Sequence, residues 1–254
     1  MDSTFVWYEL MTRDPGAAAA FYGELFGWTA RDSGQADIDY RLFESSGAGV
    51  AGVMEIPPVA AAAGMPPRWF PYVSVPNLDR AVARYVGAGG HVHAEPLSVP
   101  GVGRIAMVAD PQGALLNLIA PVGDGPSTSF APGKPGHGGW HELHATDAET
   151  ALGFYLDQFG WTKAGAIPMG PHGTYHLFGV AGGPAIGGMM ADAKLKRPAW
   201  VIVFNVDGAQ AALDRAIANG GTVTTPTVQV ATGEWVAHLQ DPQGARFAIV
   251  SRRA

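Results

Sequence analysis

One sequence pattern occurs twice in this chain, and the repeat limits the folds that are open to it. Each copy holds a Trp-x-Glu-Leu segment, a Phe-Tyr pair and a Phe-Gly-Trp-Thr segment. The two sets read Trp7-Tyr8-Glu9-Leu10, Phe21-Tyr22 and Phe26-Gly27-Trp28-Thr29, then Trp140-His141-Glu142-Leu143, Phe154-Tyr155 and Phe159-Gly160-Trp161-Thr162. The offset is constant at 133 residues (140 minus 7, 155 minus 22, 161 minus 28). A repeat of this length indicates a duplicated domain.

A second motif and an irregular segment set the domain boundaries. Asp-Pro-Gln-Gly occurs at residues 110–113 and again at 241–244. It is typical of a type I turn, so we expect it to join two antiparallel strands in each copy. Residues 122–138 are rich in Pro, Gly and Ser and show no periodicity, which indicates a linker. We therefore expect domains at residues 1–121 and 139–254.

Four segments carry apolar residues at helical spacing, within residues 18–26, 78–86, 151–159 and 209–217. Asp14, Asn77, Asp147 and Asp207 are the expected N-caps, and a glycine follows each helix. Short strand patterns fill the remaining sequence, so the unit of strand, helix and about three strands occurs four times. The Gly-rich stretches at 47–52 and 182–188 lack the Gly-Lys-Ser/Thr of a phosphate-binding loop and are expected to be bends.

The composition excludes several classes of function. The 254 residues carry a formal net charge of −6 and no basic run interleaved with aromatics, which argues against a nucleic-acid partner. Without cysteine there are no thiol nucleophiles, thiolate metal sites or disulfides, as suits a reducing compartment. The N-terminus does not resemble a signal peptide, and no apolar stretch approaches the roughly 20 residues that span a bilayer. We expect a cytoplasmic protein with no membrane partner.

The repeated pattern, closed in each copy by Asp-Pro-x-Gly, resembles the vicinal oxygen chelate superfamily. That group includes glyoxalase I, the bleomycin resistance proteins and the extradiol dioxygenases. The resemblance covers nearly the whole chain except the linker and is closest to the two-domain glyoxalase-like proteins of bacteria. It implies an α+β fold of four βαβββ modules, paired into two glyoxalase-like domains, each an open, cup-shaped eight-stranded sheet with helices outside. It also implies an internal pseudo-dimer of the two copies, and leaves open whether the chain is monomeric.

The resemblance further implies where a metal would bind. Metal-dependent members use a residue seven before the helix-capping Asp, one that opens the second module, and one seven after the Asp of the turn. These positions fall at Trp7, near Phe70 and at Asn117 in the first half, and at Trp140, near Val201 and at Ala248 in the second. Zn, Fe, Mn and Ni prefer imidazole or carboxylate, which none of these side chains offers. We therefore expect no metal at the usual positions and no cofactor, with a divalent metal as the alternative.

The candidate catalytic residues are Glu9, Glu142 and His144. Strand alternation puts Glu9 on the face of Trp7, and puts Glu142 and His144 on the face of Trp140, which the resemblance makes a cup wall. A carboxylate and an imidazole two residues apart could act as base and acid, or begin a non-standard metal site. Both glutamates could instead only hydrogen-bond to neighbouring strands, because both copies keep the Glu while one has His144.

A wider set of residues is expected to contact a ligand. It comprises the aromatic and polar side chains of the cups: Trp7, Glu9, Phe70, Asn117, Trp140, Glu142, His144 and His238. The aromatic members could form a wall for a flat, partly hydrophobic molecule, or simply fill a closed cup. His91 and His93 have a spacing that can bind metal, but no third ligand is evident, so a solvent-facing pair is expected.

Three functions remain open. The first is a small-molecule binder whose cup lacks the usual metal triad, or an enzyme that uses the same cup without metal. The second is a metal-dependent glyoxalase-like lyase or dioxygenase-family oxidoreductase with unusual ligands, drawn from Glu9, Glu142, His144 and His238. The third is a structural or interaction module with filled cups. The fold alone cannot decide among them, because function depends on the site.

Overall fold

The computed structural model describes residues 3–35, 38–123, 125–192 and 197–254. The first half contains β1 (Phe5–Thr12), α1 (Pro15–Phe26), β2 (Thr29–Asp32), β3 (Tyr40–Ser45), β4 (Ala48–Glu55), α2 (Pro58–Ala62), β5 (Arg68–Ser74), α3 (Leu78–Gly87), β6 (His91–Val99), β7 (Gly103–Ala109) and β8 (Leu115–Pro121). Residues 1 and 2 of the expected first domain, and residue 124 of the expected linker, lie outside the described residues.

The second half repeats this order. It contains β9 (Gly138–Ala145), α4 (Ala148–Phe159), β10 (Trp161–Pro168), a 3₁₀ turn (Gly170–His172), β11 (Thr174–Val180), β12 (Ala185–Ala191), β13 (Ala199–Asn205), α5 (Ala209–Ala218), β14 (Thr222–Gln229), β15 (Trp235–Gln240) and β16 (Arg246–Ser251). The four βαβββ modules expected from the repeat are therefore present.

The strands form two open eight-stranded sheets, one from each half of the sequence. Their orders are β2-β3-β4-β1-β5-β8-β7-β6 and β10-β11-β12-β9-β13-β16-β15-β14. In each module the first strand runs parallel to the fourth, as β1 does with β4 and β9 with β12, while the later strands pair antiparallel. The α+β class and the two glyoxalase-like sheets are thus confirmed.

The helix ends follow the expected signals in three of four cases. The side chains of Asp14, Asn77 and Asp147 cap α1, α3 and α4. The predicted cap Asp207 is wrong, because α5 begins after Gly208 without a side-chain cap. The C-terminal segment replaces it, since the Arg253 carbonyl accepts from the amide of Ala209 at 3.1 Å. None of the described helices is long and apolar enough to cross a membrane.

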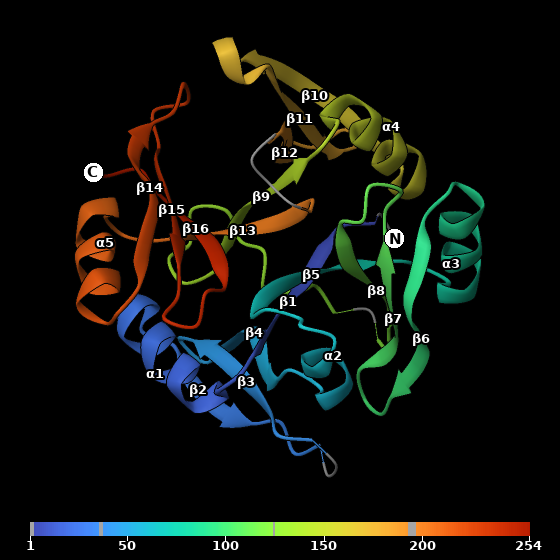
Figure 1. Ribbon diagram of the computed structural model, residues 1–254, viewed down its shortest axis with the longest axis horizontal. Helices are drawn as coiled ribbons and strands as arrows, with labels where there is room; N and C mark the ends of the chain where they lie inside the picture. Colours follow the sequence, from blue (N-terminus) through green and yellow to red (C-terminus); the bar gives the residue numbers. More distant parts are fainter. Residues whose placement is uncertain (1–2, 36–37, 124, 193–196) are drawn as a thin grey trace. The chain divides into compact units, whose positions relative to one another are not determined.

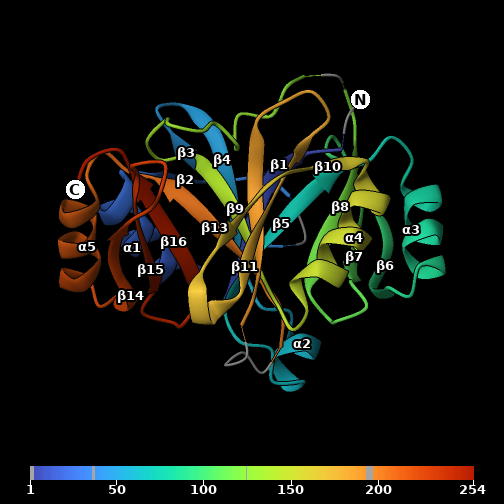
Figure 2. The same ribbon diagram turned by 90° about the horizontal axis from the view of Figure 1, so that it is seen from above.

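Contacts divide the chain into two compact units, and each unit draws on both halves of the sequence. The α3–α4 unit comprises Met1–Val6, Pro71–Pro126 and His141–Val201, and its two helices contact each other. The α1–α5 unit comprises Trp7–Phe70, Ser127–Trp140 and Ile202–Ala254, and α1 contacts α5. Figures 1 and 2 show α3 alongside β6 and β7, and α5 alongside β14 and β15. The boundaries at residues 121 and 139 stay a prediction.

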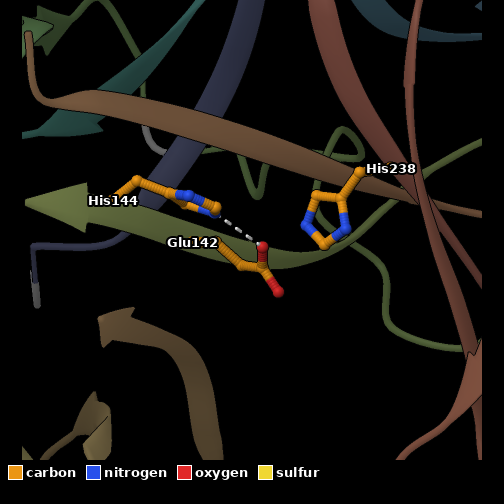
Figure 3. A group of neighbouring side chains, drawn as sticks. All are labelled: Glu142, His144 and His238. Atoms are coloured by element: carbon orange, nitrogen blue, oxygen red, sulfur yellow. Dashed lines mark hydrogen bonds and ion pairs between the residues drawn. The ribbon is translucent and has the colours of Figure 1, made fainter. Parts of the chain in front are cut away.

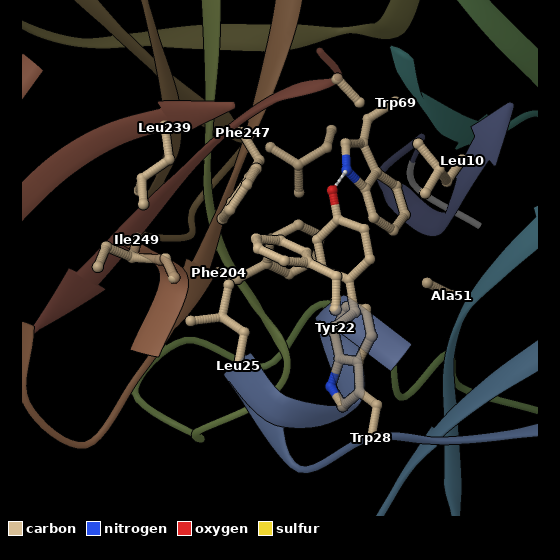
Figure 4. Packing of buried hydrophobic residues seen from close by; sticks show 14 of the residues in the cluster. Leu10, Tyr22, Leu25, Trp28, Ala51, Trp69, Phe204, Leu239, Phe247 and Ile249 are labelled. Carbon is tan, nitrogen blue, oxygen red and sulfur yellow. Dashed lines mark hydrogen bonds between the residues drawn. The ribbon is translucent and has the colours of Figure 1, made fainter. Parts of the chain in front are cut away.

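The repeated aromatic residues form the core of the α1–α5 unit, as expected from their helical spacing. Tyr22 packs edge-on against Trp69 and Phe247, with ring centroids 5.3 and 5.6 Å apart (Figure 4). Phe204 packs edge-on against Trp28 and Trp69, with both pairs of centroids 5.3 Å apart. Trp69 comes from β5, whereas Phe204 and Phe247 come from β13 and β16. Residues far apart in the sequence therefore share one core.

The Asp-Pro-Gln-Gly turn holds the helix of another module, in addition to joining two strands. The Tyr22 hydroxyl donates to Asp241 at 3.1 Å, and the Trp69 indole donates to Tyr22 at 2.9 Å. Gln243 accepts from the amide of Asp14 at 2.9 Å and donates to its carbonyl at 2.8 Å. Burial raises the pKa of the Asp241 carboxyl, which hydrogen bonds from backbone amides and Tyr22 partly offset.

The α3–α4 unit repeats this arrangement with the other turn. The Tyr155 hydroxyl donates to Asp110 at 3.0 Å, and the Trp200 indole donates to Tyr155 at 3.2 Å. Gln112 accepts from the amide of Asp147 at 2.8 Å. Gly113 has a φ of +95°, a left-handed conformation that favours glycine, which explains the last residue of the motif.

Candidate functional site

A buried glutamate in the first half takes part in a closed polar network. Glu9 on β1 lies in register with Gly52 of β4, and a Cβ added at Gly52 would sit 2.0 Å from the Tyr40 hydroxyl. The glycine thus leaves room for the Tyr40 ring, and residues 48–55 form a strand rather than the bend predicted there. The Trp7 indole donates to the Tyr40 hydroxyl at 3.0 Å. Burial raises the pKa of Tyr40 well above its ordinary value, and the nearby Glu9 raises that pKa further.

The second half repeats the glutamate, the tyrosine and the glycine. Glu142 on β9 lies in register with Gly188 of β12, and a Cβ added at Gly188 would sit 2.2 Å from the Tyr175 ring. The Tyr175 hydroxyl donates to Glu142 Oε1 at 3.3 Å. Residues 185–191 are again a strand, so the second predicted bend is also wrong. Glycine in both stretches makes space for a tyrosine ring, which a turn-based interpretation of Gly-rich sequence does not anticipate.

His144 distinguishes the second half, because the corresponding residue of the first half is Met11. Its Nε2 lies 3.2 Å from Glu142 Oε2 (Figure 3). Its Nδ1 lies 3.4 Å from Asp192 Oδ2. The imidazole is therefore held between two carboxylates. Burial alone would lower the pKa of His144, but the hydrogen bonds and charges of Glu142 and Asp192 outweigh it and raise that pKa.

His238 belongs to the same sheet as Glu142 and His144, on β15, where it lies in register with Ala248 of β16. The corresponding residue of the first half is Met107, in register with Asn117.

The positions that the resemblance assigns to a metal do not fit one. Phe70 and Ala248 are fully buried, Asn117 is 2 % exposed, and Val201 is buried in the second half. Trp7 uses its indole on Tyr40, and Trp140 is half-buried on β9. The Nδ2 atom of Asn117 has no hydrogen-bond partner among the described residues. Indole, phenyl, aliphatic and amide groups at these positions provide no suitable donor set.

The remaining sequence candidates lie elsewhere. His91 and His93 are exposed on β6, as expected for a solvent-facing pair. Two surface hollows lie in the α1–α5 unit, of about 210 Å³ beside Arg13 and Met65 and about 500 Å³ along α1 and Asn219. Neither hollow is lined by a residue that the sequence analysis selected.

Sequence reasoning missed three residues that contact the candidate glutamates or His144. Tyr40 and Tyr175 occur near the same place in the two halves, so comparison of the copies could have found them. Asp192 follows β12 and carried no signal, because its role depends on the parallel pairing of β12 with β9.

Comparison with known proteins finds relatives over nearly the whole chain. The family model described as Glyoxalase/Bleomycin resistance protein/Dioxygenase superfamily matches residues 4–118 and 139–249. The anthracycline biosynthesis protein DauV of Streptomyces sp. (strain C5) is 35% identical, over 97% of this chain and 92% of that protein. CFP32 of Mycobacterium tuberculosis (strain CDC 1551 / Oshkosh), whose name proposes a glyoxylase, is 32% identical over 96% of this chain and 93% of its own.

Solved structures share the fold at low sequence identity. A Mn(II)-bound glyoxalase from Novosphingobium aromaticivorans has a TM-score of 0.67 at 16% identity, covering 100% of this chain and 82% of that one. The 2,2',3-trihydroxybiphenyl 1,2-dioxygenase of Sphingomonas wittichii strain RW1 has a TM-score of 0.68 at 12% identity, covering 99% and 91%. At these identities the likeness concerns the fold alone.

Proposed function

Because the chain belongs to the Glyoxalase/Bleomycin resistance protein/Dioxygenase superfamily, we propose that it binds a small, partly hydrophobic molecule in the cup of its second half. We propose further that this cup lacks the family's usual metal triad. One observation carries the proposal: in the second half the family's metal positions hold apolar side chains, while the buried Glu142 is joined by the half-buried His144, Tyr175 and Asp192. Such a cluster can position the polar group of a ligand whose body stacks on aromatic rings.

The chemistry of the ligand follows from the residues and from one relative. Trp140 lies two residues before Glu142 on β9, so both side chains point to the same face of the strand. An indole beside a carboxylate suits a flat molecule with hydroxyl or keto groups. The relative DauV bears the name of an anthracycline biosynthesis protein, which supports a polycyclic aromatic ligand. We propose this class of molecule.

The second half is favoured over the first because its polar groups differ. In the first half Trp7 and Glu9 both engage Tyr40, and the position of His144 is taken by Met11. The first half therefore lacks a titratable group at that position beside its glutamate. His144 is therefore the residue proposed to exchange a proton with a phenolic ligand, because Met11 at the corresponding position of the first half cannot.

The proposal is tested by titrating the full chain with an anthracycline aglycone and following the fluorescence anisotropy of the aglycone. We expect saturable binding, which Trp140→Ala weakens at least tenfold because a stacking surface is lost. Trp7→Ala is the matched control from the first half and is expected to change the affinity less than threefold. Circular dichroism spectra of both variants establish that they fold.

Two outcomes would overturn the proposal. One is the lack of saturable binding up to the solubility limit of the aglycone. The other is equal weakening by Trp7→Ala and Trp140→Ala, which would remove the reason for choosing the second half.

The proposal also covers the binding partners of the protein and its cellular compartment. A small molecule is the proposed partner, without nucleic acid or membrane, and the two halves are proposed to act as an internal pseudo-dimer. The absence of cysteine supports the cytoplasm as the proposed compartment. If the bound molecule is transformed, the family supports a glyoxalase-like lyase or a dioxygenase-type oxidoreductase.

A further inference from the structure

We propose that the hollow at the carboxyl ends of β1 and β4 binds a small zwitterion, namely a free α-amino acid with an apolar side chain. The hollow has a volume of about 210 Å³ and is lined by Arg13, Glu55, Ile56, Ala61, Gly64 and Met65. All six residues belong to the α1–α5 unit. The inference goes beyond the proposed function, because this site shares no residue with the Glu142 cluster.

Two parallel strands bring the charged residues of the hollow to one edge of the sheet. β1 and β4 run parallel, with Thr12 in register with Glu55. Arg13 follows β1 directly, and the amide of Ile56 donates to the Thr12 carbonyl at 2.8 Å. Strand register therefore places a guanidinium and a carboxylate at the same hollow.

These two opposite charges are not paired with each other. No ion pair joins Arg13 to Glu55 among the residues that the structure describes. Arg13 Nη1 donates to the Gln243 carbonyl at 3.3 Å, and the Gln243 side chain in turn holds Asp14. The guanidinium is thus anchored on one side, and its further N–H groups can donate to a ligand carboxylate. The Glu55 carboxylate can accept from a ligand ammonium group, so a zwitterion satisfies both residues.

A helix end supplies the apolar wall of the hollow. The amide of Gly64 donates to the Ala61 carbonyl at 2.9 Å, and the amide of Met65 donates to the Ala60 carbonyl at 3.0 Å. This pair of bonds is a Schellman motif, which needs the left-handed conformation that Gly64 adopts with a φ of +78°. It fixes the backbone of Met65, while Ile56 adds a side chain that is buried. An apolar ligand side chain is expected between these two residues.

The volume of the hollow limits the size of the ligand. Pockets for drug-sized molecules have volumes of about 300–1,000 Å³. The hollow, at about 210 Å³, is smaller and corresponds to about seven water molecules at roughly 30 Å³ each. A polycyclic ligand is therefore too large, whereas a single amino acid such as leucine or methionine suits the space.

The second half of the chain provides an internal contrast. The pairing of Thr12 with Glu55 recurs there as Ala145 with Ala191, and the residue that follows Ala145 is Thr146. The positions of Arg13 and Glu55 are thus taken by Thr146 and Ala191, which carry no charge. The charged pair is not part of the repeated scaffold, as expected for a site that is used once.

The experiment observes the hollow directly by NMR. The full chain, with its eight methionines labelled by ¹³C at the methyl group, is titrated with L-leucine, and Met65→Leu assigns the Met65 resonance. We expect a saturable shift of the Met65 methyl resonance and no shift of Met169, which is exposed in the α3–α4 unit. N-acetyl-L-leucine lacks the ammonium charge and L-leucinamide lacks the carboxylate. Each should bind about threefold more weakly, because partly exposed ion pairs contribute little.

Variants of the chain test the same two contacts from the protein side. Arg13→Gln and Glu55→Gln should each weaken L-leucine binding about threefold, and the double variant at least tenfold. Arg80→Gln is the matched control, since it removes an exposed arginine from α3 in the other unit, and it should bind like the unmodified chain. Urea unfolding of each variant establishes that it folds, because Arg13→Gln also removes the contact with Gln243.

Four outcomes would overturn the proposal. They are the lack of a saturable Met65 shift, an analogue that binds as tightly as L-leucine, an Arg13 or Glu55 variant with unchanged affinity, and weakened binding by Arg80→Gln. None of these measurements uses the aglycone or alters Trp140. The failure of this proposal is therefore distinguishable from the failure of the proposed function.

Discussion

His137 lies in the segment that joins the two halves, yet its side chain is fully buried. Its Nδ1 lies 2.6 Å from the Thr128 carbonyl, and its own carbonyl accepts from the backbone and side-chain amides of Asn205. Its Nε2 has no hydrogen-bond partner among the described residues. Burial lowers the pKa of His137, with Lys134 adding to the decrease and the Thr128 carbonyl opposing it. A segment expected to be a linker is therefore anchored by a neutral imidazole.

This histidine should make the fold sensitive to acid. Because the pKa of His137 is lower in the folded chain than the ordinary value of about 6.5, the unfolded chain binds more protons below that pH. The contribution of this residue to the free energy of unfolding is complete above pH 6.5. As the pH falls below that value, the contribution is lost at up to about 1.4 kcal/mol per pH unit. We expect His137→Gln to flatten the fall in the free energy of unfolding between pH 7 and 5, measured with urea.

Identical slopes of the unfolding free energy against pH for His137→Gln and the unmodified chain would show that the buried imidazole does not carry the effect.

At the scale of elements, the repeated helices begin in two different ways. The Asp147 carboxylate accepts from the amides of Glu149 and Thr150 at 3.1 and 3.0 Å, which caps α4. Asp207 stands before α5 but makes no cap, and it contacts the exposed Arg253 at 3.8 Å. We expect Asp147→Ala to lower the free energy of unfolding by about 1 kcal/mol, because capped amides lose their acceptor. Urea unfolding measures this loss.

Asp207→Ala is the matched control, with an expected loss below about 0.5 kcal/mol, since exposed ion pairs contribute little. Equal losses in the two variants would contradict this account of the helix starts. A sequence rule that assigns a cap to any Asp before an apolar stripe cannot separate the two cases. The deciding contact comes from Arg253, which is near the end of the chain.

The elements that the sequence predicts well are those set by local pattern. Helical spacing located α1, α3, α4 and α5, and Asp14, Asn77 and Asp147 marked three of their starts. The Gly-rich strands β4 and β12 were missed, because their glycines accommodate Tyr40 and Tyr175 from a neighbouring strand. For the candidate site, strand alternation placed Glu142 and His144 on one face. It could not supply Asp192 or Tyr175, whose contacts depend on sheet order.

At the scale of the whole molecule, the division of the chain into two sheets differs from its division into two compact units. Each sheet comes from one half of the sequence, whereas each compact unit takes modules from both. In the α1–α5 unit, Tyr22 and Trp69 of the first half pack on Phe204 and Phe247 of the second. Domain boundaries drawn from the repeat therefore describe the hydrogen-bonded sheets and leave the shared core out.

We expect that residues 1–121, produced alone, do not unfold cooperatively. Aromatic residues such as Tyr22 and Trp69 would lose their partners and expose apolar area, which a small core cannot tolerate. Produced together with residues 139–254, the two pieces should copurify and show one cooperative urea transition. The full chain is the reference for both measurements. Cooperative unfolding of residues 1–121 alone, at a midpoint near that of the full chain, would show that the first half is independent.

Each Asp-Pro-Gln-Gly turn supports the start of a helix in the other half of the sequence, and this affects how the two copies can evolve. Duplication normally leaves one copy free to diverge while the other preserves the ancestral role. Here Gln243 supports the start of α1 and Gln112 supports the start of α4, so each copy carries a part that the other needs. Selection therefore acts on both copies of the scaffold at once, whereas positions outside these turn contacts, such as Met11 and His144, can differ between the copies.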